Sequence, residues 1–295
     1  MASMADASGL LVSDELVAAF ARDGFAVVPD LLTAEELGRY VDAVDAAVAE
    51  RTGADTRTLA EKSRYEQSFV QCINLWEDFP DVRALTFHPL VTAAAARLLG
   101  ADALRLWHDQ ALYKEAGGRE TDAHQDCPYW PIAEPDAVTA WIPLEGSTLD
   151  GGAMGYFAGS HLLGVRKFVN IFFGEPEDVA ASDLLREIEP TFVEVPAGSV
   201  AFHHGMTFHV ARPNATGAVR RVHTAIYFKD GCRRGSNFPH FAVDRAGIEV
   251  GGVIDSDVTP IAWPRRPGDL PTPSSLPQRP LSADEVRTYF PKYAE

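Results

Sequence analysis

The sequence has few cysteines and a shortage of basic residues. Cys72, Cys127 and Cys232 lie far apart and no CxxC pair occurs, which argues against a disulfide framework and against a zinc knuckle. Lysine and arginine number 26 against 42 aspartates and glutamates, so the formal net charge is −16. Such a charge disfavours nucleic acid and anionic membranes as partners.

Long apolar runs are also absent. No stretch reaches the roughly 18 consecutive apolar residues of a membrane span, and we expect no membrane partner. Residues 1–24 contain no basic segment followed by a long apolar run, so we expect no secretory signal. These absences predict a cytoplasmic protein with reduced thiols.

What is present is enough apolar sequence for a sizeable core. The chain has 295 residues, of which 46% are hydrophobic, and we predict a single domain over 1–295. Its expected parts are a mainly helical support layer over 1–102, a β core over 103–230 and a C-terminal extension over 231–295. The extension contains a proline-rich segment, 264–280, which we expect to lie extended on the surface.

Capping signals mark the helices. A capping box is indicated by the spacing of Thr33 and Glu36, and a short β-like run covers 25–30. Another short helix is expected at 282–290. The N-terminal helices are predicted over 13–24, 32–53 and 88–101, closed by glycine at or near their ends.

From residue 103 onward the pattern becomes that of strands. Turn-forming segments such as EGSTLDGG and PNATG separate runs rich in β-branched and aromatic residues. This pattern is typical of an all-β barrel or sandwich. The runs cover 103–118, 138–144, 191–213 and 219–228.

The stretch His124-Gln125-Asp126 is a candidate for part of a metal site. A mononuclear non-haem iron site needs two imidazoles and one carboxylate on one face of the metal. In extended backbone, His124 and Asp126 would point to the same side. The third ligand should come from a distant strand, and the downstream candidates are His161, His203, His204 and His209.

A hairpin argument selects His209. If PNATG forms the turn, His209 pairs near Val222 and Ala211 pairs near Arg220, so all four share one face. A histidine and an arginine would then converge on one pocket. A slip of one residue would replace Arg220 by Arg221.

Charge balance explains why a metal pocket would contain an arginine. Fe(II) with two neutral histidines and one aspartate carries one positive charge, and a bound dicarboxylate leaves one negative charge. A single guanidinium restores neutrality and donates a forked pair of hydrogen bonds to the far carboxylate. Arg220 follows His209 by eleven residues, and this constellation is what a 2-oxoglutarate site requires.

The chain resembles the phytanoyl-CoA dioxygenase family, which includes ectoine hydroxylase and bacterial tailoring oxygenases. The resemblance rests on the stretches HQDCPYW at 124–130, VTAWIPLEGSTLDGGAMGYFAGSH at 138–161 and PAGSVAFHHGMTFHVARPNATGAVRR at 196–221. It implies a mainly β fold: a double-stranded β-helix (jelly-roll) core with a helical N-terminal layer and flanking helices. At the matching positions it implies iron ligands His124, Asp126 and His209, a cosubstrate arginine Arg220, and Trp141 as an aromatic wall near the cosubstrate.

Two departures from the family pattern concern the site. Ala158 stands where a proline is usual, and Val210-Ala211 follow the distal histidine where Gly-Ser is often found. If that serine normally contacts the cosubstrate, another donor is needed, and Lys114 or Gln110 could supply it from one face of their strand. The retained Asp126 argues against a halogenase.

Several neighbouring residues have an ordinary structural interpretation. His203 and His204 are adjacent, so at most one faces the pocket, and we expect a hydrogen-bonded structural role rather than a ligand role. His161 is also expected to be structural. For Tyr129 and Trp130, lining the substrate pocket and packing under the barrel rim are equally open.

We therefore expect an Fe(II)- and 2-oxoglutarate-dependent dioxygenase. It would use O₂ to hydroxylate, or otherwise oxidise at C–H, a small organic substrate, with release of succinate and CO₂. The alternatives are a cupin-like oxygenase or hydrolase that does not use 2-oxoglutarate, and a non-catalytic β-helix binding protein. Arg220 argues against the former, and the full ligand set against the latter. The sequence leaves open the substrate, the choice among hydroxylation, desaturation, cyclisation and epimerisation, acceptance of a CoA thioester, and the oligomeric state.

Overall fold

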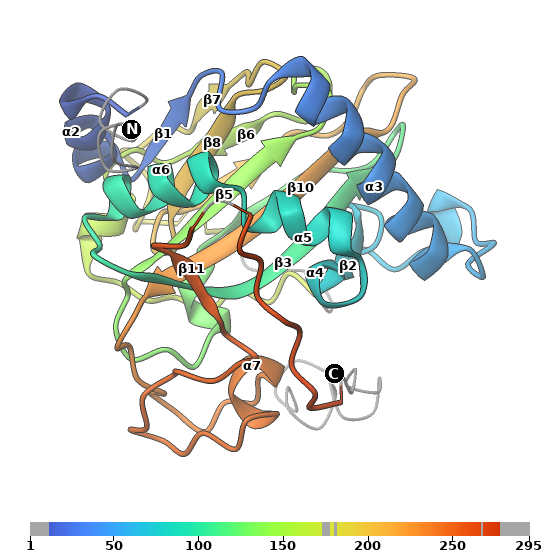
Figure 1. Cartoon of the computed structure of the whole chain (residues 1–295). Helices are drawn as coiled ribbons and strands as arrows, with labels where there is room; N and C mark the ends of the chain where they lie inside the picture. The colour runs from blue at the N-terminus through green and yellow to red at the C-terminus, as the bar shows by residue number, and fades with distance from the viewer. Residues whose placement is uncertain (1–11, 173–177, 180–181, 267, 278–295) are drawn as a thin grey trace.

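The computed structural model describes residues 12–172, 178–179, 182–266 and 268–277. Two antiparallel sheets form its centre (Figure 1). The large sheet has the order β1-β8-β5-β10-β3-β11, with β2 also paired to β3, and the small sheet has the order β4-β9-β6-β7. The strands are β1 (Phe25–Val28), β2 (Val70–Ile73), β3 (Leu104–Lys114), β4 (Thr121–His124), β5 (Ala137–Pro143), β6 (Met154–Tyr156), β7 (Thr191–Val193), β8 (Val200–His204), β9 (His209–Ala211), β10 (Arg220–Lys229) and β11 (Ile261–Trp263).

Helices cover the outer face of the large sheet, where α3, α5 and α6 lie across the strands (Figure 1). The largest apolar cluster joins helix residues such as Val44 of α3 and Val91 of α6 to strand residues such as Leu106 of β3 and Tyr227 of β10. The helices are α2 (Asp14–Asp23), α3 (Ala34–Thr52), α4 (Leu75–Asp78), α5 (Pro80–Thr86), α6 (Pro89–Leu99) and α7 (Phe241–Asp244), with short 3₁₀ turns η1 (Leu59–Glu61), η2 (Cys127–Tyr129) and η3 (Ser160–Leu163).

The predicted helix ends are confirmed where capping chemistry marked them. Ser13 accepts a hydrogen bond from the backbone of Leu16, and α2 closes at Gly24, whose φ of 81° favours glycine. The reciprocal hydrogen bonds of Thr33 and Glu36 form the predicted capping box of α3. Local side-chain chemistry therefore determines where these helices begin and end.

The predicted hairpin between β9 and β10 is wrong. β9 pairs with β4 and β6 in the small sheet, whereas β10 pairs with β3 and β5 in the large sheet. The PNATG segment thus carries the chain from one sheet to the other. Ala211 and Val222 nevertheless pack in one cluster between the sheets, because each lies on the inward face of its own sheet. His209 and Arg220 therefore line one cavity because the inward faces of two sheets meet, and not because their strands pair in a hairpin.

Chain outside the predicted β core also contributes strands. β1 lies beside β8 at one end of the large sheet, and β11 pairs with β3 at the other. The described part of 264–280 forms neither helix nor strand, and the helix expected at 282–290 falls outside the described residues. Within the described chain, none of the helices combines the length and apolar character needed to cross a membrane. The single-domain assignment stays a prediction.

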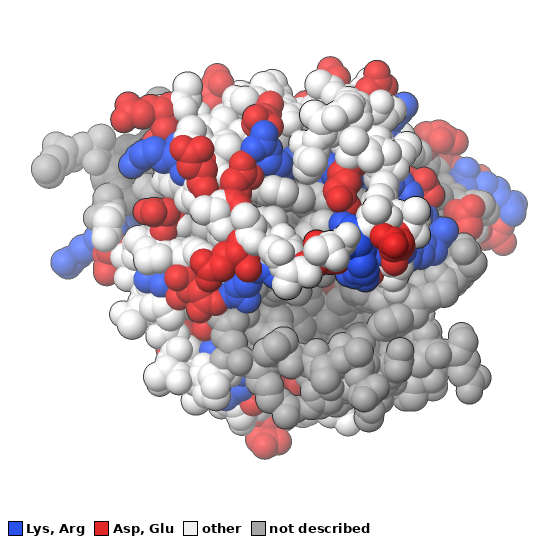
Figure 2. Space-filling model, turned by 90° about the vertical axis from the view of Figure 1, so that its right-hand side faces the viewer, with Lys and Arg blue, Asp and Glu red and all other residues white. Residues whose placement is uncertain are grey.

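Charged side chains of both signs are interspersed over the described surface that faces the viewer in Figure 2. On that face the negative net charge is not gathered into one acidic patch. Many of the charged groups are paired, as Arg57 is with Asp55 and Glu66 at the surface. Such exposed pairs contribute little to stability.

A buried ion pair fixes α7 to α4. Nη1 and Nη2 of Arg245 donate to the two carboxylate oxygens of Glu77, at 2.6 and 3.0 Å, and both side chains are under 10% exposed. Because Arg245→Ala leaves a buried carboxylate unpaired, we expect it to lower the free energy of unfolding by about 3 kcal/mol. Arg22→Ala, which breaks the exposed pair with Asp23, should lower the free energy of unfolding far less, because water screens that pair. Urea denaturation of the two variants measures this difference, and equal losses would contradict it.

Candidate metal centre and cavity

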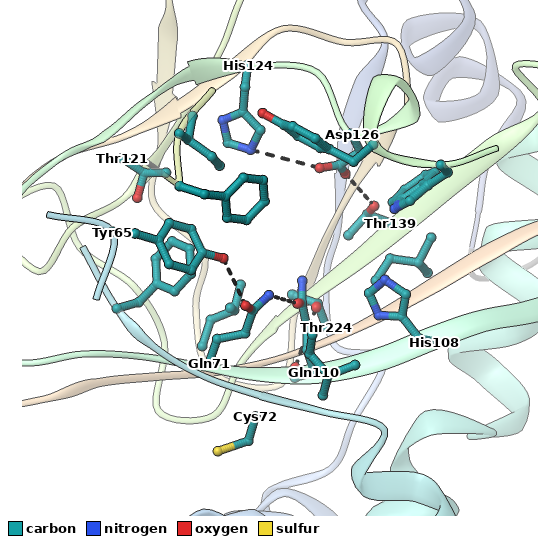
Figure 3. A pocket seen from close by; sticks show the side chains of 18 of the residues that line it. Tyr65, Gln71, Cys72, His108, Gln110, Thr121, His124, Asp126, Thr139 and Thr224 are labelled. Carbon is teal, nitrogen blue, oxygen red and sulfur yellow. Dashed lines mark hydrogen bonds and ion pairs between the residues drawn. The ribbon is translucent and has the colours of Figure 1, made fainter. Parts of the chain in front are cut away.

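Three side chains of the predicted ligand set converge between the sheets. Nε2 of His124 lies 3.9 Å, and Nε2 of His209 3.7 Å, from Oδ1 of Asp126. One ligand atom from each residue lies within 4.8 Å of the others. β4 and β9 place the two histidines directly opposite each other in register. Figure 3 shows the His124 ring directed toward the Asp126 carboxylate on one side of the pocket.

Asp126 reaches this point by a turn and not by strand alternation. Its φ of −78° and ψ of −48° are helical, so the expectation of an extended backbone is wrong at this residue. The backbone N–H groups of Asp126 and Cys127 both donate to the carbonyl of Gly205. A Cβ at position 205 would lie 2.5 Å from the sulfur of Cys127. Glycine there permits the close approach that holds the turn.

Hydrogen bonds orient both imidazoles. Nδ1 of His124 donates to the carbonyl of Asp122 at 2.7 Å, and Nδ1 of His209 donates to that of Thr207 at 3.0 Å. With the proton on Nδ1, each Nε2 presents its lone pair to the centre. Burial lowers the pKa of both histidines, which favours the neutral, metal-binding form.

Hydrogen bonds hold only one of the two carboxylate oxygens of Asp126. Its Oδ2 accepts hydrogen bonds from Thr139 at 2.9 Å and from His203 at 3.1 Å, while Oδ1 faces the two imidazoles. Burial alone would raise the pKa of Asp126, but the neighbouring imidazoles, His209 foremost, lower it overall. Two neutral imidazoles and one ionised carboxylate fit a facial iron site with open positions toward the cavity.

A cavity of about 690 Å³ extends from the three ligands over the large sheet. Even-numbered residues of β3 and β10 form its floor, among them His108, Gln110, Thr224 and Ile226. Figure 3 shows Gln110 and Thr224 on this floor, below His124 and Asp126. The size lies within the range of roughly 300–1,000 Å³ typical of small-molecule sites.

Arg220 lies at one end of the cavity floor. Its side chain is buried, Nη1 donates to the carbonyl of Gly152 at 2.7 Å, and the guanidinium lies 5.3 Å from the ring centroid of Trp141. Nε has no partner, and no carboxylate within the described chain pairs with this group. Burial lowers the pKa of Arg220 to about 10, so the group stays charged at neutral pH. A buried cation of this kind requires an anion.

The residues considered as alternatives or additions to Arg220 have other partners. Arg221 points to the surface and pairs with Asp45 and Glu145. Lys114 is the register partner of Arg220 but donates to the carbonyl of Arg119 and, at 3.5 Å, to the hydroxyl of Thr121.

Burial and the adjacent Arg220 lower the pKa of Lys114 to about 6. Gln110 lies mid-floor and accepts a hydrogen bond from Gln71. Both side chains thus have other hydrogen-bond partners, and a role for either in cosubstrate binding stays a prediction.

Sequence reasoning missed part of the cavity. Thr139 precedes Trp141 by two positions in β5, so its side chain could have been predicted to lie on the same face of the strand as that of Trp141. Tyr65 and Gln71 come from the segment around β2, and His240 from the start of α7, where no pattern indicated a site. Tyr129 and Trp130 both line the cavity and also pack against neighbouring rings. The other two candidate histidines lie outside it: His204 pairs with the backbone of Met206, and His161 lies near the carbonyl of Ala21.

Thr139→Val removes one of the two hydrogen bonds to Asp126 with little change in volume. Because such bonds orient the ligand carboxylate, we expect the variant to bind Fe(II) about 10- to 100-fold more weakly. Thr92→Val is a matched control, since Thr92 is equally buried but bonds only within α6. Competition with a chelator of known affinity measures how tightly each variant binds Fe(II). An unchanged affinity in Thr139→Val would rule out this role.

The comparisons with known proteins agree with this geometry. The family model described as phytanoyl-CoA dioxygenase (PhyH) matches residues 20–222. A probable alpha-ketoglutarate-dependent hypophosphite dioxygenase of Stutzerimonas stutzeri is 30% identical over 122 residues, which is 40% of this chain and 43% of that protein. The chain therefore aligns with less than half of this curated relative.

Two solved structures from nogalamycin biosynthesis match most of the chain, each at 26% identity and a TM-score of 0.70. The non-haem alpha-ketoglutarate-dependent carbocyclase SnoK covers 84% of this chain and 96% of its own. The epimerase SnoN, solved with Fe³⁺, alpha-ketoglutarate and nogalamycin RO, covers 84% and 98%. The predicted mainly β, jelly-roll fold of the 2-oxoglutarate oxygenases is confirmed, as is the predicted enzyme class of non-haem iron, 2-oxoglutarate-dependent oxygenase. The chain belongs to the phytanoyl-CoA dioxygenase family.

Proposed function

We propose that the protein holds Fe(II) with His124, Asp126 and His209 and binds 2-oxoglutarate against Arg220. In the proposed reaction O₂ and 2-oxoglutarate oxidise a C–H bond of a small organic molecule, giving succinate and CO₂. One oxygen atom enters succinate and, in a hydroxylation, the other enters the product. The observation that carries the proposal is the buried guanidinium without a carboxylate partner in the same cavity as three converging ligands.

Iron, when bound, supplies the redox chemistry that couples decarboxylation of the cosubstrate to oxidation of the substrate. The chain's own residues supply position and charge. Thr139 and His203 hold the Asp126 carboxylate so that Oδ1 is directed to the centre. Arg220 offers a charged donor to the far carboxylate of the cosubstrate, with Gly152 and Trp141 fixing the guanidinium plane.

Thr121 is a further candidate for cosubstrate binding. The hydroxyl that the family often places two residues after the distal histidine is absent, since Ala211 stands there. Thr121 is the register partner of Ala211 on the neighbouring strand, lines the cavity and is bonded by Lys114. A hydroxyl from the adjacent strand thus lies beside position 211.

The cavity argues against a substrate as small as hypophosphite. A space of about 690 Å³ with many aromatic side chains is far larger than a few-atom anion requires. We therefore propose a larger organic substrate. Hydroxylation, desaturation, cyclisation and epimerisation all use the same set of residues.

Arg220→Ala should weaken 2-oxoglutarate binding about 100-fold, because it removes a charged, buried hydrogen-bond donor. The measurement is an anaerobic titration of the Fe(II) protein with 2-oxoglutarate, following the weak visible charge-transfer band. Arg221→Ala is the matched control, since that neighbouring arginine pairs with Asp45 and Glu145 at the surface, and it should bind as the wild type does. Equal affinities in the two variants would exclude Arg220 as the anchor and favour an oxygenase or hydrolase that does not use 2-oxoglutarate.

A further inference from the structure

The cavity has a second end, remote from Arg220. Ile226 follows Arg220 by six residues on β10 and therefore lies roughly 20 Å along the strand. Ile226 pairs with His108 of β3, and both side chains line the cavity. If the cosubstrate occupies the end at Arg220, as proposed above, the end at His108 is left for the substrate.

The described lining of this distal end contains no unpaired charge. Besides Asp126 and Arg220, the charged residues that line the cavity are Arg51 and Arg245. Arg51 pairs with an aspartate of α4, and Arg245 pairs with Glu77. A charged substrate would be removed from water without a counter-ion, at a large energetic cost. The distal end is therefore built for a neutral molecule.

Two aromatic walls enclose the floor. One wall contains Tyr65, whose ring centroid lies 5.1 Å from that of Phe69 and 4.8 Å from that of Phe172. On the other wall His240 lies 4.4 Å from Phe241. Figure 3 shows Tyr65 and His108 on opposite sides, with Gln110 between them. Aromatic walls on two sides of a cavity suit a flat, unsaturated ligand.

His108 and His240 bring complementary polar edges to this end. Nδ1 of His240 accepts a hydrogen bond from the backbone of Ala242, so the proton of the neutral ring lies on Nε2. Nδ1 of His108 faces the carbonyl of Asp109 at 3.4 Å and carries the proton there, which leaves a lone pair on Nε2. Burial lowers the pKa of His108 to about 4 and that of His240 well below its usual value. One ring is thus a donor and the other an acceptor.

The two rings are close enough to act on one group. Their centroids are 5.8 Å apart, and His240 is stacked on Trp107 at 4.4 Å, which restrains its plane. Within the described chain neither Nε2 has a protein hydrogen-bond partner, although both residues line the cavity. A hydroxyl both donates and accepts, so it can satisfy both rings, whereas a carbonyl can only accept.

We propose that His108 and His240 form a substrate-recognition subsite for a neutral, planar aromatic molecule that carries a hydroxyl group. The assignment of this end to the substrate rests on the proposed function. The histidines position the hydroxyl, and the aromatic walls hold the ring system over Gln110 and Thr224. A carboxylate of the same ring system is disfavoured by the missing counter-charge.

Binding of three simple probes tests the subsite. The probes are 2-naphthol, naphthalene and 2-naphthoate, titrated calorimetrically into protein loaded with Ni(II) and 2-oxoglutarate. We expect 2-naphthol to bind about 10-fold more tightly than either of the other two, since only it is neutral and hydrogen-bonding. His108→Phe and His240→Phe keep a ring but lose the polar edge. Each should weaken 2-naphthol about 10-fold and leave naphthalene unchanged.

Two further variants serve as controls. His161→Phe makes the same change outside the cavity and should bind all three probes as the wild type does. His240→Gln keeps an N–H donor and should recover most of the affinity for 2-naphthol, which a merely structural role would not predict. Circular dichroism checks that each variant is folded.

The outcomes separate this inference from the proposed function. Absence of the Fe(II)–2-oxoglutarate band ends the proposed function, whereas titration of 2-naphthol into metal-free protein still compares the histidine variants. Equal binding of 2-naphthol by wild type and both phenylalanine variants overturns the subsite. Binding of 2-naphthoate as tight as that of 2-naphthol, or failure of all three probes to bind, overturns it as well.

Discussion

The site depends on one tight turn. Two successive backbone N–H groups, those of Asp126 and Cys127, converge on the carbonyl of Gly205, and this contact carries the aspartate out of β4 and toward the two imidazoles. Without it an extended backbone would continue the strand beyond His124. The donors Thr139 and His203 then hold one carboxylate oxygen, so that the other faces the two imidazoles. Fold and chemistry meet at this point.

Much of the fold could be predicted because its signals are local. Ser13, Gly24 and the pair Thr33–Glu36 mark helix ends by hydrogen bonds within a few residues. The strands of the core were expected from alternation and turn residues. What alternation does not show is which strands pair. A turn-like segment such as PNATG is compatible with a hairpin and with a crossing between sheets, and only the packing of distant chain decides between them.

The candidate site was predicted in part for similar reasons. Residue type and spacing indicated the three ligands and Arg220, although the backbone geometry assumed for Asp126 and for the hairpin was wrong. The distal end of the cavity had no such signal. His108 is one of several histidines in the chain, and His240 lies in a segment without clear periodicity. They lie close together because the chain before α7 packs on β3, where His240 is stacked on Trp107, and the buried pair of Arg245 and Glu77 fixes α7 to α4.

The crossing between the sheets has a mechanical consequence. His209 belongs to the small sheet and Arg220 to the large one, although only eleven residues separate them. A cosubstrate bound to both residues would bridge the two sheets. Any shift of one sheet relative to the other would then change the distance that the cosubstrate has to span, even when every contacting side chain is intact. Substitutions that repack the interior around Met154 and Val222 would thus weaken cosubstrate binding without touching a binding residue.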